Sequence, residues 1–153
     1  MATPIASVRI NPATGSLSFL EIGITVDFMT RWKAFPEILK KSIRGTEEQA
    51  MGWISYHIGP FTFEGHEVAL SFGFHCTELK SVLFTLAGTP ETTEDPDSNA
   101  PVDERLILQQ AFESQLGVVL VKDGFTRFSW GSVVCCYHPK DGFLFAGLQH
   151  KSL

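Results

Sequence analysis

The feature that most constrains this chain is the strict alternation of residues 67–74, which read EVALSFGF. Val68, Leu70, Phe72 and Phe74 occupy every second position, and the positions between them hold small or charged residues. A strand directs successive side chains to opposite faces, so this period of two predicts a β-strand with one buried face. The other face of the strand is left with side chains that tolerate water.

The segments around this strand predict a three-stranded antiparallel meander over residues 54–88. Residues 54–63 and 81–88 are rich in β-branched and aromatic residues, which favour strands. Glu64 and Gly65 lie where the first hairpin would turn. The short connections mean that the three strands pair in the order in which they occur.

The C-terminal segment predicts a further hairpin, formed by residues 128–137 and 143–150 around the turn sequence HPKDG. Both strands are apolar on both faces, so we expect them in the middle of a sheet with both faces covered. Adjacent side chains on a strand point apart, and Cys135 and Cys136 are therefore expected to be two small buried hydrophobic residues. A shared metal ion or a redox pair would need a different spacing.

The first fifty residues predict a hairpin and a short helix. The strands of the hairpin are 6–10 and 16–26, separated by the turn sequence NPATG. Residues 35–45 suggest the helix, with Pro36 in its first turn and Gly45 at its end. Thr46 and Gln49 have the spacing of a capping box, which could begin another helical turn in 46–53.

A longer helix is predicted over residues 102–116, with Gly117 at its end. Its clearest apolar face consists of Leu108, Ala111, Phe112 and Leu116, and we expect it to cover the sheet. The preceding segment 88–101, GTPETTEDPDSNAP, contains prolines and carboxylates and no large apolar side chain. It predicts a mobile acidic surface loop.

Together these elements predict an α+β fold over residues 1–153: a single domain with a largely antiparallel twisted sheet packed by one or two helices. Hydrophobic residues form 44% of the chain, and Phe alone occurs at 13 positions. A chain of this size and composition can bury a core without disulfides or metal ions.

The charge and hydropathy of the chain argue against nucleic acids and membranes as partners. The net charge is −5, whereas general nucleic-acid binding needs a positive surface, so we expect no nucleic-acid partner. The charge is uneven, with a basic stretch at 31–44 and an acidic one at 91–104. No apolar run has the length of a membrane span, and the N-terminus does not read as a secretory signal. Since the three cysteines are too few for a disulfide scaffold, we expect a cytoplasmic protein with no membrane partner.

No catalytic motif is strong. The sequence lacks G-x-S-x-G, G-x-G-x-x-G and phosphate-loop patterns, and its five histidines show no metallopeptidase spacing. Cys76 as a nucleophile with a distant histidine stays open as an alternative. Trp32 and Trp53 could line a pocket or anchor an interface, while Trp130 is expected in the core beside Gly131, which would leave room for a ring. We expect no metal, no cofactor and no enzymatic activity.

The order of features in the last ninety residues resembles a group of small bacterial proteins. In these, a Trp-Gly pair and a Tyr-x-x-Lys-x-Gly turn close the domain, and several act as immunity proteins encoded beside secreted antibacterial toxins. The matching residues here are Phe72, Leu79, Trp130, Gly131, Tyr137, Lys140 and Gly142. The resemblance implies a cognate toxin or effector protein as the partner.

The sequence therefore leads to a protein-binding immunity protein that neutralises its toxin by occlusion. The candidate contacts are the carboxylates of the acidic loop: Glu91, Glu94, Asp95 and Asp97. A small-ligand-binding domain or minor enzyme is the first alternative, with a pocket between the helix 102–116 and the sheet and polar groups such as His57, His66 or His75. The second alternative is a structural subunit of a larger assembly, and self-association into a homo-oligomer stays open.

Overall fold

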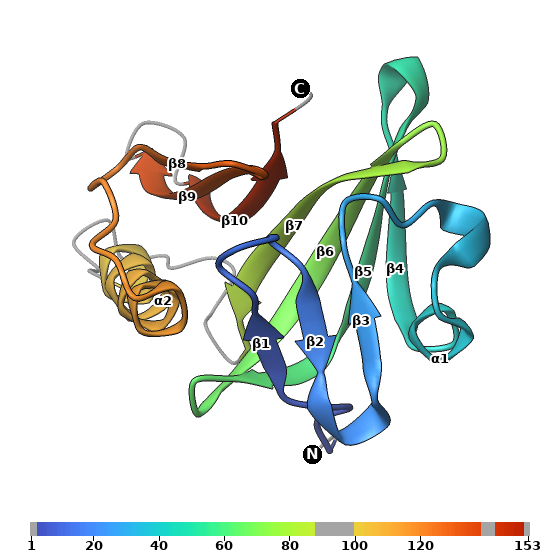
Figure 1. Cartoon of the computed structure of the whole chain (residues 1–153), viewed down its shortest axis with the longest axis horizontal. Helices are drawn as coiled ribbons and strands as arrows, with labels where there is room; N and C mark the ends of the chain where they lie inside the picture. Colours follow the sequence, from blue (N-terminus) through green and yellow to red (C-terminus); the bar gives the residue numbers. More distant parts are fainter. Residues whose placement is uncertain (1–2, 88–99, 139–142, 152–153) are drawn as a thin grey trace.

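The computed structural model describes residues 3–87, 100–138 and 143–151. The strands form a three-stranded and a seven-stranded sheet. Figure 1 shows the small sheet in front of part of the larger one, with the long helix to the side. The strand pairings within both sheets are antiparallel. The fold class is α+β, as the sequence predicts.

The larger sheet has the strand order β4-β5-β6-β7-β10-β9-β8. The predicted meander is confirmed as β5, β6 and β7, and the C-terminal hairpin as β9 and β10. An additional short strand, β8, pairs with β9 at the edge. The bounds are β4 Ile43–Glu48, β5 Trp53–Phe63, β6 His66–His75, β7 Glu78–Leu86, β8 Phe125–Phe128, β9 Gly131–His138 and β10 Phe143–His150.

The smaller sheet is formed by β1, β2 and β3, which pair in sequence order. The predicted turn at 11–15 is confirmed, but the single strand expected over 16–26 is wrong. Gly23 adopts a left-handed conformation (φ 64°) and reverses the chain, so the segment forms two strands that pair with each other. The elements are β1 Val8–Ile10, β2 Leu17–Phe19, a 3₁₀ turn Leu20–Ile22 and β3 Ile24–Val26.

One apolar core fills the space between the two sheets and the long helix α2, Ala100–Leu116. On β6 the alternation is confirmed, because Val68, Leu70, Phe72 and Phe74 are all buried. On α2 the predicted face is also confirmed as buried: Leu108, Ala111, Phe112 and Leu116.

Three phenylalanine rings join α2 to the large sheet. The ring of Phe112 lies 5.4 Å from that of Phe63 on β5 and 5.0 Å from that of Phe84 on β7. Two hydrogen bonds add to this packing, since Glu104 accepts the Leu86 N–H and Gln115 accepts the Ile10 N–H, each at 2.9 Å. The helix is therefore fixed to both sheets.

The helix predicted over 35–45 is mostly wrong. Only α1, Glu37–Lys40, is helical, and Pro36 precedes it instead of opening it. Residues 43–48 are drawn into β4 by pairing with β5, so the capping box predicted at Thr46 and Gln49 does not form; a 3₁₀ turn follows at Ala50–Gly52. Backbone pairing to an established strand outweighs a weak local helical preference.

An aromatic cluster beside α1 packs against β5 and β6. Trp32, in a 3₁₀ turn at Trp32–Ala34, stacks on Tyr56 with a ring distance of 4.2 Å, and Phe35 packs edge-on to Phe72 and Phe74. Lys40 at the end of α1 lies 4.6 Å above the Trp32 ring, in a cation–π contact.

Trp130 is buried, as the sequence predicts, but the reason given for the space around it is wrong. The ring lies directly against Gly15, where any side chain would collide with the indole. Gly131 instead faces the backbone of Gln149 on β10. The indole N–H of Trp130 donates to the Pro12 carbonyl at 2.9 Å, so the ring fastens the small sheet to the C-terminal hairpin.

We predict that Phe112→Ala lowers the free energy of unfolding by about 3–5 kcal/mol, because it removes a fully buried ring between two strands. The measurement is urea unfolding followed by tryptophan fluorescence. Leu106→Ala is the matched control on the same helix; its side chain is 47% exposed, and the change should cost less than about 1 kcal/mol. Equal losses for the two variants would contradict this packing.

Candidate functional site

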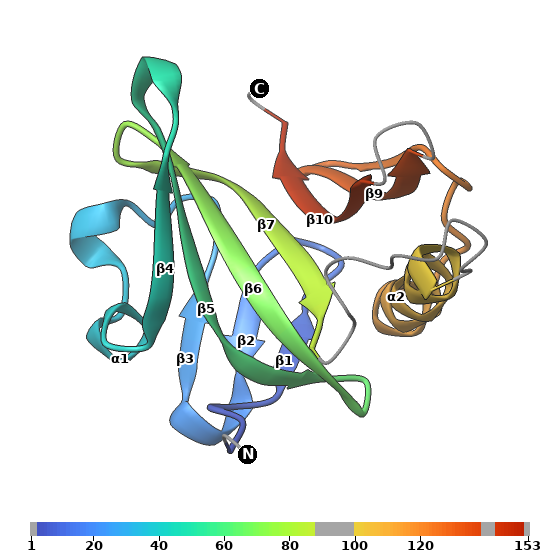
Figure 2. The same ribbon diagram turned by 180° about the vertical axis from the view of Figure 1, so that it is seen from behind.

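The seven-stranded sheet buries one face; its other face is open over β4–β7 and holds the buried side chains of Val134 and Cys136 at β9. Figure 2 shows the side of β4–β7 that faces away from the small sheet, and no other described element crosses it. We call this surface the open face. The strand register places two rows of residues across it. The rows are Glu47, Ser55, Gly73, Ser81, Gln149, Ser132 and Arg127, and His57, Ser71, Leu83, Gly147, Val134 and Phe125.

The open face follows from the same alternation that builds the core. On β6, the positions between the buried apolar residues are Ala69, Ser71 and Gly73, which point to the open side. Ala69 and Ser71 are half-buried. The result is a regular surface of small and polar side chains at the centre, with larger residues at the β4 and β8 ends.

A serine, a histidine and a glutamate lie together on the open face. His57 Nδ1 is 2.6 Å from Ser71 Oγ, and His57 Nε2 is 3.2 Å from Glu47 Oε1. Acyl transfer would also need N–H donors aimed at a developing oxyanion. Here β5 and β6 are paired on both sides, so their N–H groups lie in the plane of the sheet. The three side chains form a cross-strand polar network.

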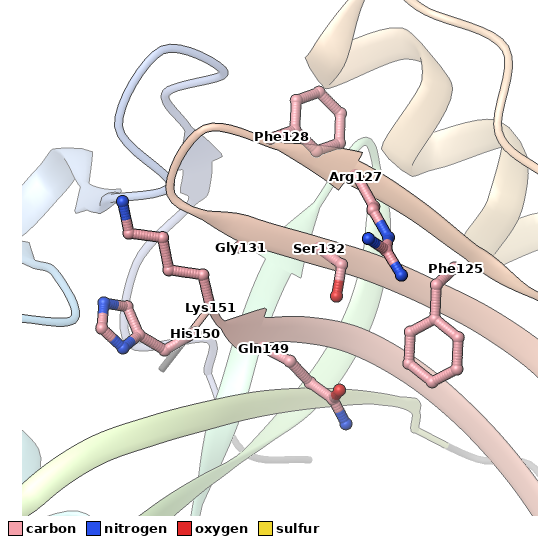
Figure 3. A pocket seen from close by; sticks show the side chains of 8 residues that line it. All are labelled: Phe125, Arg127, Phe128, Gly131, Ser132, Gln149, His150 and Lys151. Carbon is pink, nitrogen blue, oxygen red and sulfur yellow. The ribbon is translucent and has the colours of Figure 1, made fainter. Parts of the chain in front are cut away.

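A hollow lies at the β8 end of the open face. It has a volume of about 550 Å³ and is lined from three strands by residues that include Phe125, Arg127, Ser132 and Gln149, with His150 and Lys151 at its end. In Figure 3, Arg127, Ser132 and Gln149 lie side by side on neighbouring strands. We call this hollow the β8 groove.

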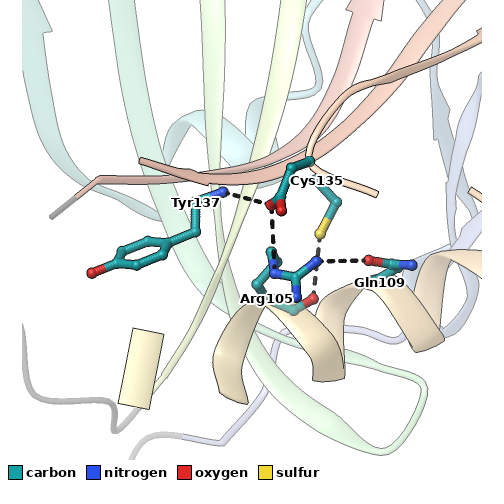
Figure 4. Close-up of polar contacts among 5 residues, drawn as sticks. Arg105, Gln109, Cys135 and Tyr137 are labelled. Atoms are coloured by element: carbon teal, nitrogen blue, oxygen red, sulfur yellow. Dashed lines mark hydrogen bonds and ion pairs between the residues drawn. The ribbon is translucent and has the colours of Figure 1, made fainter. Parts of the chain in front are cut away.

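On the covered face of β9, a polar cluster fixes the hairpin to α2 (Figure 4). The Cys135 thiol donates to the Arg105 carbonyl at 3.3 Å, and Arg105 Nε lies 3.6 Å from Asp123 Oδ1. Gln109 accepts a hydrogen bond from the same guanidinium, while the Tyr137 N–H donates to Asp123. The guanidinium is only slightly exposed and is held from both sides, so Arg105 serves the structure.

The adjacent cysteines, Cys135 and Cys136, differ in the direction of their side chains. They point to opposite faces of β9, as predicted, and both are buried. Burial raises the pKa of the Cys135 thiol to about 12 and also raises that of Cys136. A thiol with a raised pKa carries little thiolate at neutral pH and is a poor nucleophile. Cys76, in contrast, is exposed at the turn between β6 and β7.

The other predicted residues are not brought together. Glu91, Glu94, Asp95 and Asp97 lie outside the described part of the chain. His57 lies on the open face, and the His75 ring lies 5.0 Å from that of Trp53 in a tilted arrangement. The position expected for a pocket under α2 is filled by the phenylalanine rings, and His66 lines a hollow of about 300 Å³ at its margin.

Within residues 3–87, 100–138 and 143–151, no three histidine, cysteine or acidic side chains are grouped so that they could hold a metal ion. The described helices include none with the length and apolar character needed to cross a membrane.

The β8 groove is the feature that sequence reasoning missed. Its polar residues come from three strands, and one of these strands, β8, was not predicted. The only local signal is the alternation in FTRF at 125–128, which places Phe125 and Arg127 on one face. Nothing in the sequence shows that Arg127 pairs across β9 with Ser132 and Gln149.

The fold has a counterpart among solved structures. A chain in the structure "Rhs1-CT in complex with cognate immunity protein RhsI1" matches with a TM-score of 0.53 at 18% sequence identity. The match covers 95% of this chain and 88% of that chain, well beyond the ninety residues of the sequence resemblance. At this identity it shows a shared fold. No protein-family model and no curated protein matches the sequence.

We predict that only one thiol of the native protein reacts rapidly with iodoacetamide at pH 8, namely Cys76. Cys135 and Cys136 should react within the same time only after denaturation, because burial holds both in the thiol form. Mass spectrometry of alkylated peptides measures this directly. Cys76→Ser should abolish the rapid reaction, and rapid labelling of Cys135 in the native protein would contradict its burial.

Proposed function

We propose that this protein is an immunity protein that binds a cognate antibacterial toxin and neutralises it by occlusion. The observation that carries the proposal is the fold shared with a chain of a toxin–immunity complex over 95% of this chain. The sequence resemblance at Trp130, Gly131 and Tyr137 supports it from a separate direction.

The open face suits occlusion for a physical reason. A stable protein interface needs about 800 Å² from each partner, roughly one-tenth of the 8753 Å² accessible surface of this protein. The open face lies on paired strands, which lose little conformational entropy on binding compared with loops. A partner of matching shape would find a surface that is already ordered.

In this proposal the protein acts in the cytoplasm by binding alone, without a cofactor and without catalysis. Glu91, Glu94, Asp95 and Asp97 remain the acidic contacts that the sequence predicts. Complementary charge of this kind mainly raises the rate of association, while a few buried aromatic side chains supply most of the affinity.

The test begins with affinity purification of the tagged protein from its native host and identification of bound proteins by mass spectrometry. The captured partner is then expressed with and without this protein in a laboratory bacterium. We expect the partner alone to arrest growth, co-expression to restore it, and the purified pair to form a stable complex in light scattering. An inactive point variant of the partner, which should be harmless alone, is the control.

Two results would count against the proposal. Growth arrest caused by this protein on its own would give it the activity of a toxin. A captured partner that is equally toxic with and without this protein would separate binding from protection.

A further inference from the structure

The β8 groove carries positive charge on a protein whose net charge is −5. Arg127 on β8 and Lys151 after β10 both line the groove and are exposed. A second hollow of about 260 Å³ adjoins it and shares His150, and it is lined by Arg31 and Lys80 among others. Lys80 and His150 alternate with Ser81 and Gln149 along their strands, so they point to the other face of the sheet, and the cations of the β8 groove itself are Arg127 and Lys151.

Among the described residues that line either hollow there is one carboxylate, Glu78 in the second hollow, and it already forms two ion pairs. Glu78 lies 3.4 Å from Arg31 and 3.2 Å from Lys80. Its hydrogen bond and attraction to Lys80, with a smaller effect of Arg31, lower the pKa of Glu78. Glu78 thus offsets part of the charge at the far side, while the Arg127 side of the groove contains no carboxylate among its described lining residues.

His150 lines both hollows and lies close enough to two of the lysines for their charge to act on it. Its pKa is lowered by burial and, in addition, by the positive charges of Lys80 and Lys151. The ring is therefore largely neutral at pH 7 and adds a polar group without adding charge.

Exposed apolar side chains accompany the cations. Phe125 is 55% exposed in the β8 groove, and Met29 is 81% exposed in the adjoining hollow. Phe128, which also lines the groove, stacks on the buried Trp130 ring at 5.2 Å. An aromatic anchor beside arginine is the combination that concentrates binding energy at protein interfaces.

From this geometry we infer that the β8 groove is the docking site for an acidic segment of the partner protein, one that carries carboxylates and an apolar side chain. The inference rests on the proposed function and names the chemistry of the contact. The guanidinium of Arg127 can bind a carboxylate in bidentate geometry. The Ser132 hydroxyl and the Gln149 amide can form further hydrogen bonds, and Phe125 can pack on the apolar residue. A long nucleic-acid backbone fits less well, since the net charge of −5 would repel it outside the groove.

The first experiment compares two charge reversals of equal size in binding to the purified partner. Arg127→Glu/Lys151→Glu should weaken binding more than tenfold, chiefly through slower association, and the difference should shrink at high salt. The control is Lys41→Glu/Arg44→Glu, which reverses two cations in a hollow that has no aromatic side chain and should leave the affinity within about twofold. Phe125→Ala should speed dissociation by about tenfold or more. Thermal unfolding verifies that all variants are folded.

The second experiment needs no partner and uses a defined probe. The amide NMR spectrum of the ¹⁵N-labelled protein is recorded during titration with the peptide Ac-EEFEDE-NH₂ and, separately, with a 20-base-pair DNA duplex. We expect the peptide to shift the signals of Phe125, Arg127, Ser132 and Lys151, and to leave those around Arg44 unchanged. The DNA should produce weaker shifts at the same concentration.

The outcomes separate this inference from the proposed function. Wild-type affinity of the Arg127→Glu/Lys151→Glu variant for a neutralised toxin would overturn the inference while leaving the immunity role intact. Peptide shifts confined to the β8 groove, with no toxin ever captured, would support the groove and count against the immunity role. Tighter binding of DNA than of the peptide at these residues would overturn the choice of partner.

Discussion

The structure depends on the burial of a single face of the seven-stranded sheet. The apolar side chains of β5, β6 and β7 that point to this face need cover, and the small sheet, the Trp32 cluster and α2 supply it together. Each of these elements would expose its own apolar side if it left the sheet. Over β4–β7 the opposite face carries mainly small and polar residues, and no other described element covers it.

Much of this arrangement could be predicted from sequence where the local pattern and the final burial agree. The alternation around Phe72 specifies a strand and its buried face, and the spacing of Leu108, Phe112 and Leu116 specifies one side of a helix. The separation of Cys135 from Cys136 follows from strand geometry alone. In each case the residue pattern determines the outcome without knowledge of a partner strand.

The rest depends on contacts between distant segments. Residues 43–48 become a strand because β5 is beside them, and the chain reverses at Gly23 because β3 can pair with β2. The β8 groove requires the register of three strands, since Arg127, Ser132 and Gln149 are neighbours only after β8, β9 and β10 have paired. Pair formation of this kind leaves no local signal in the sequence.

The hydrogen bond from Trp130 to Pro12 also has a consequence for how the chain is made. It joins residues separated by 118 positions, and the bond from Ile10 to Gln115 spans 105. Contacts so distant in sequence require the closure of long loops before they contribute any free energy. The small sheet therefore precedes Trp130 in synthesis, and this contact can form only after β4–β8 have been made. Packing of the small sheet on β5 can come earlier, through Phe19 and Phe61, whereas the contact with Trp130 is among the later ones to form.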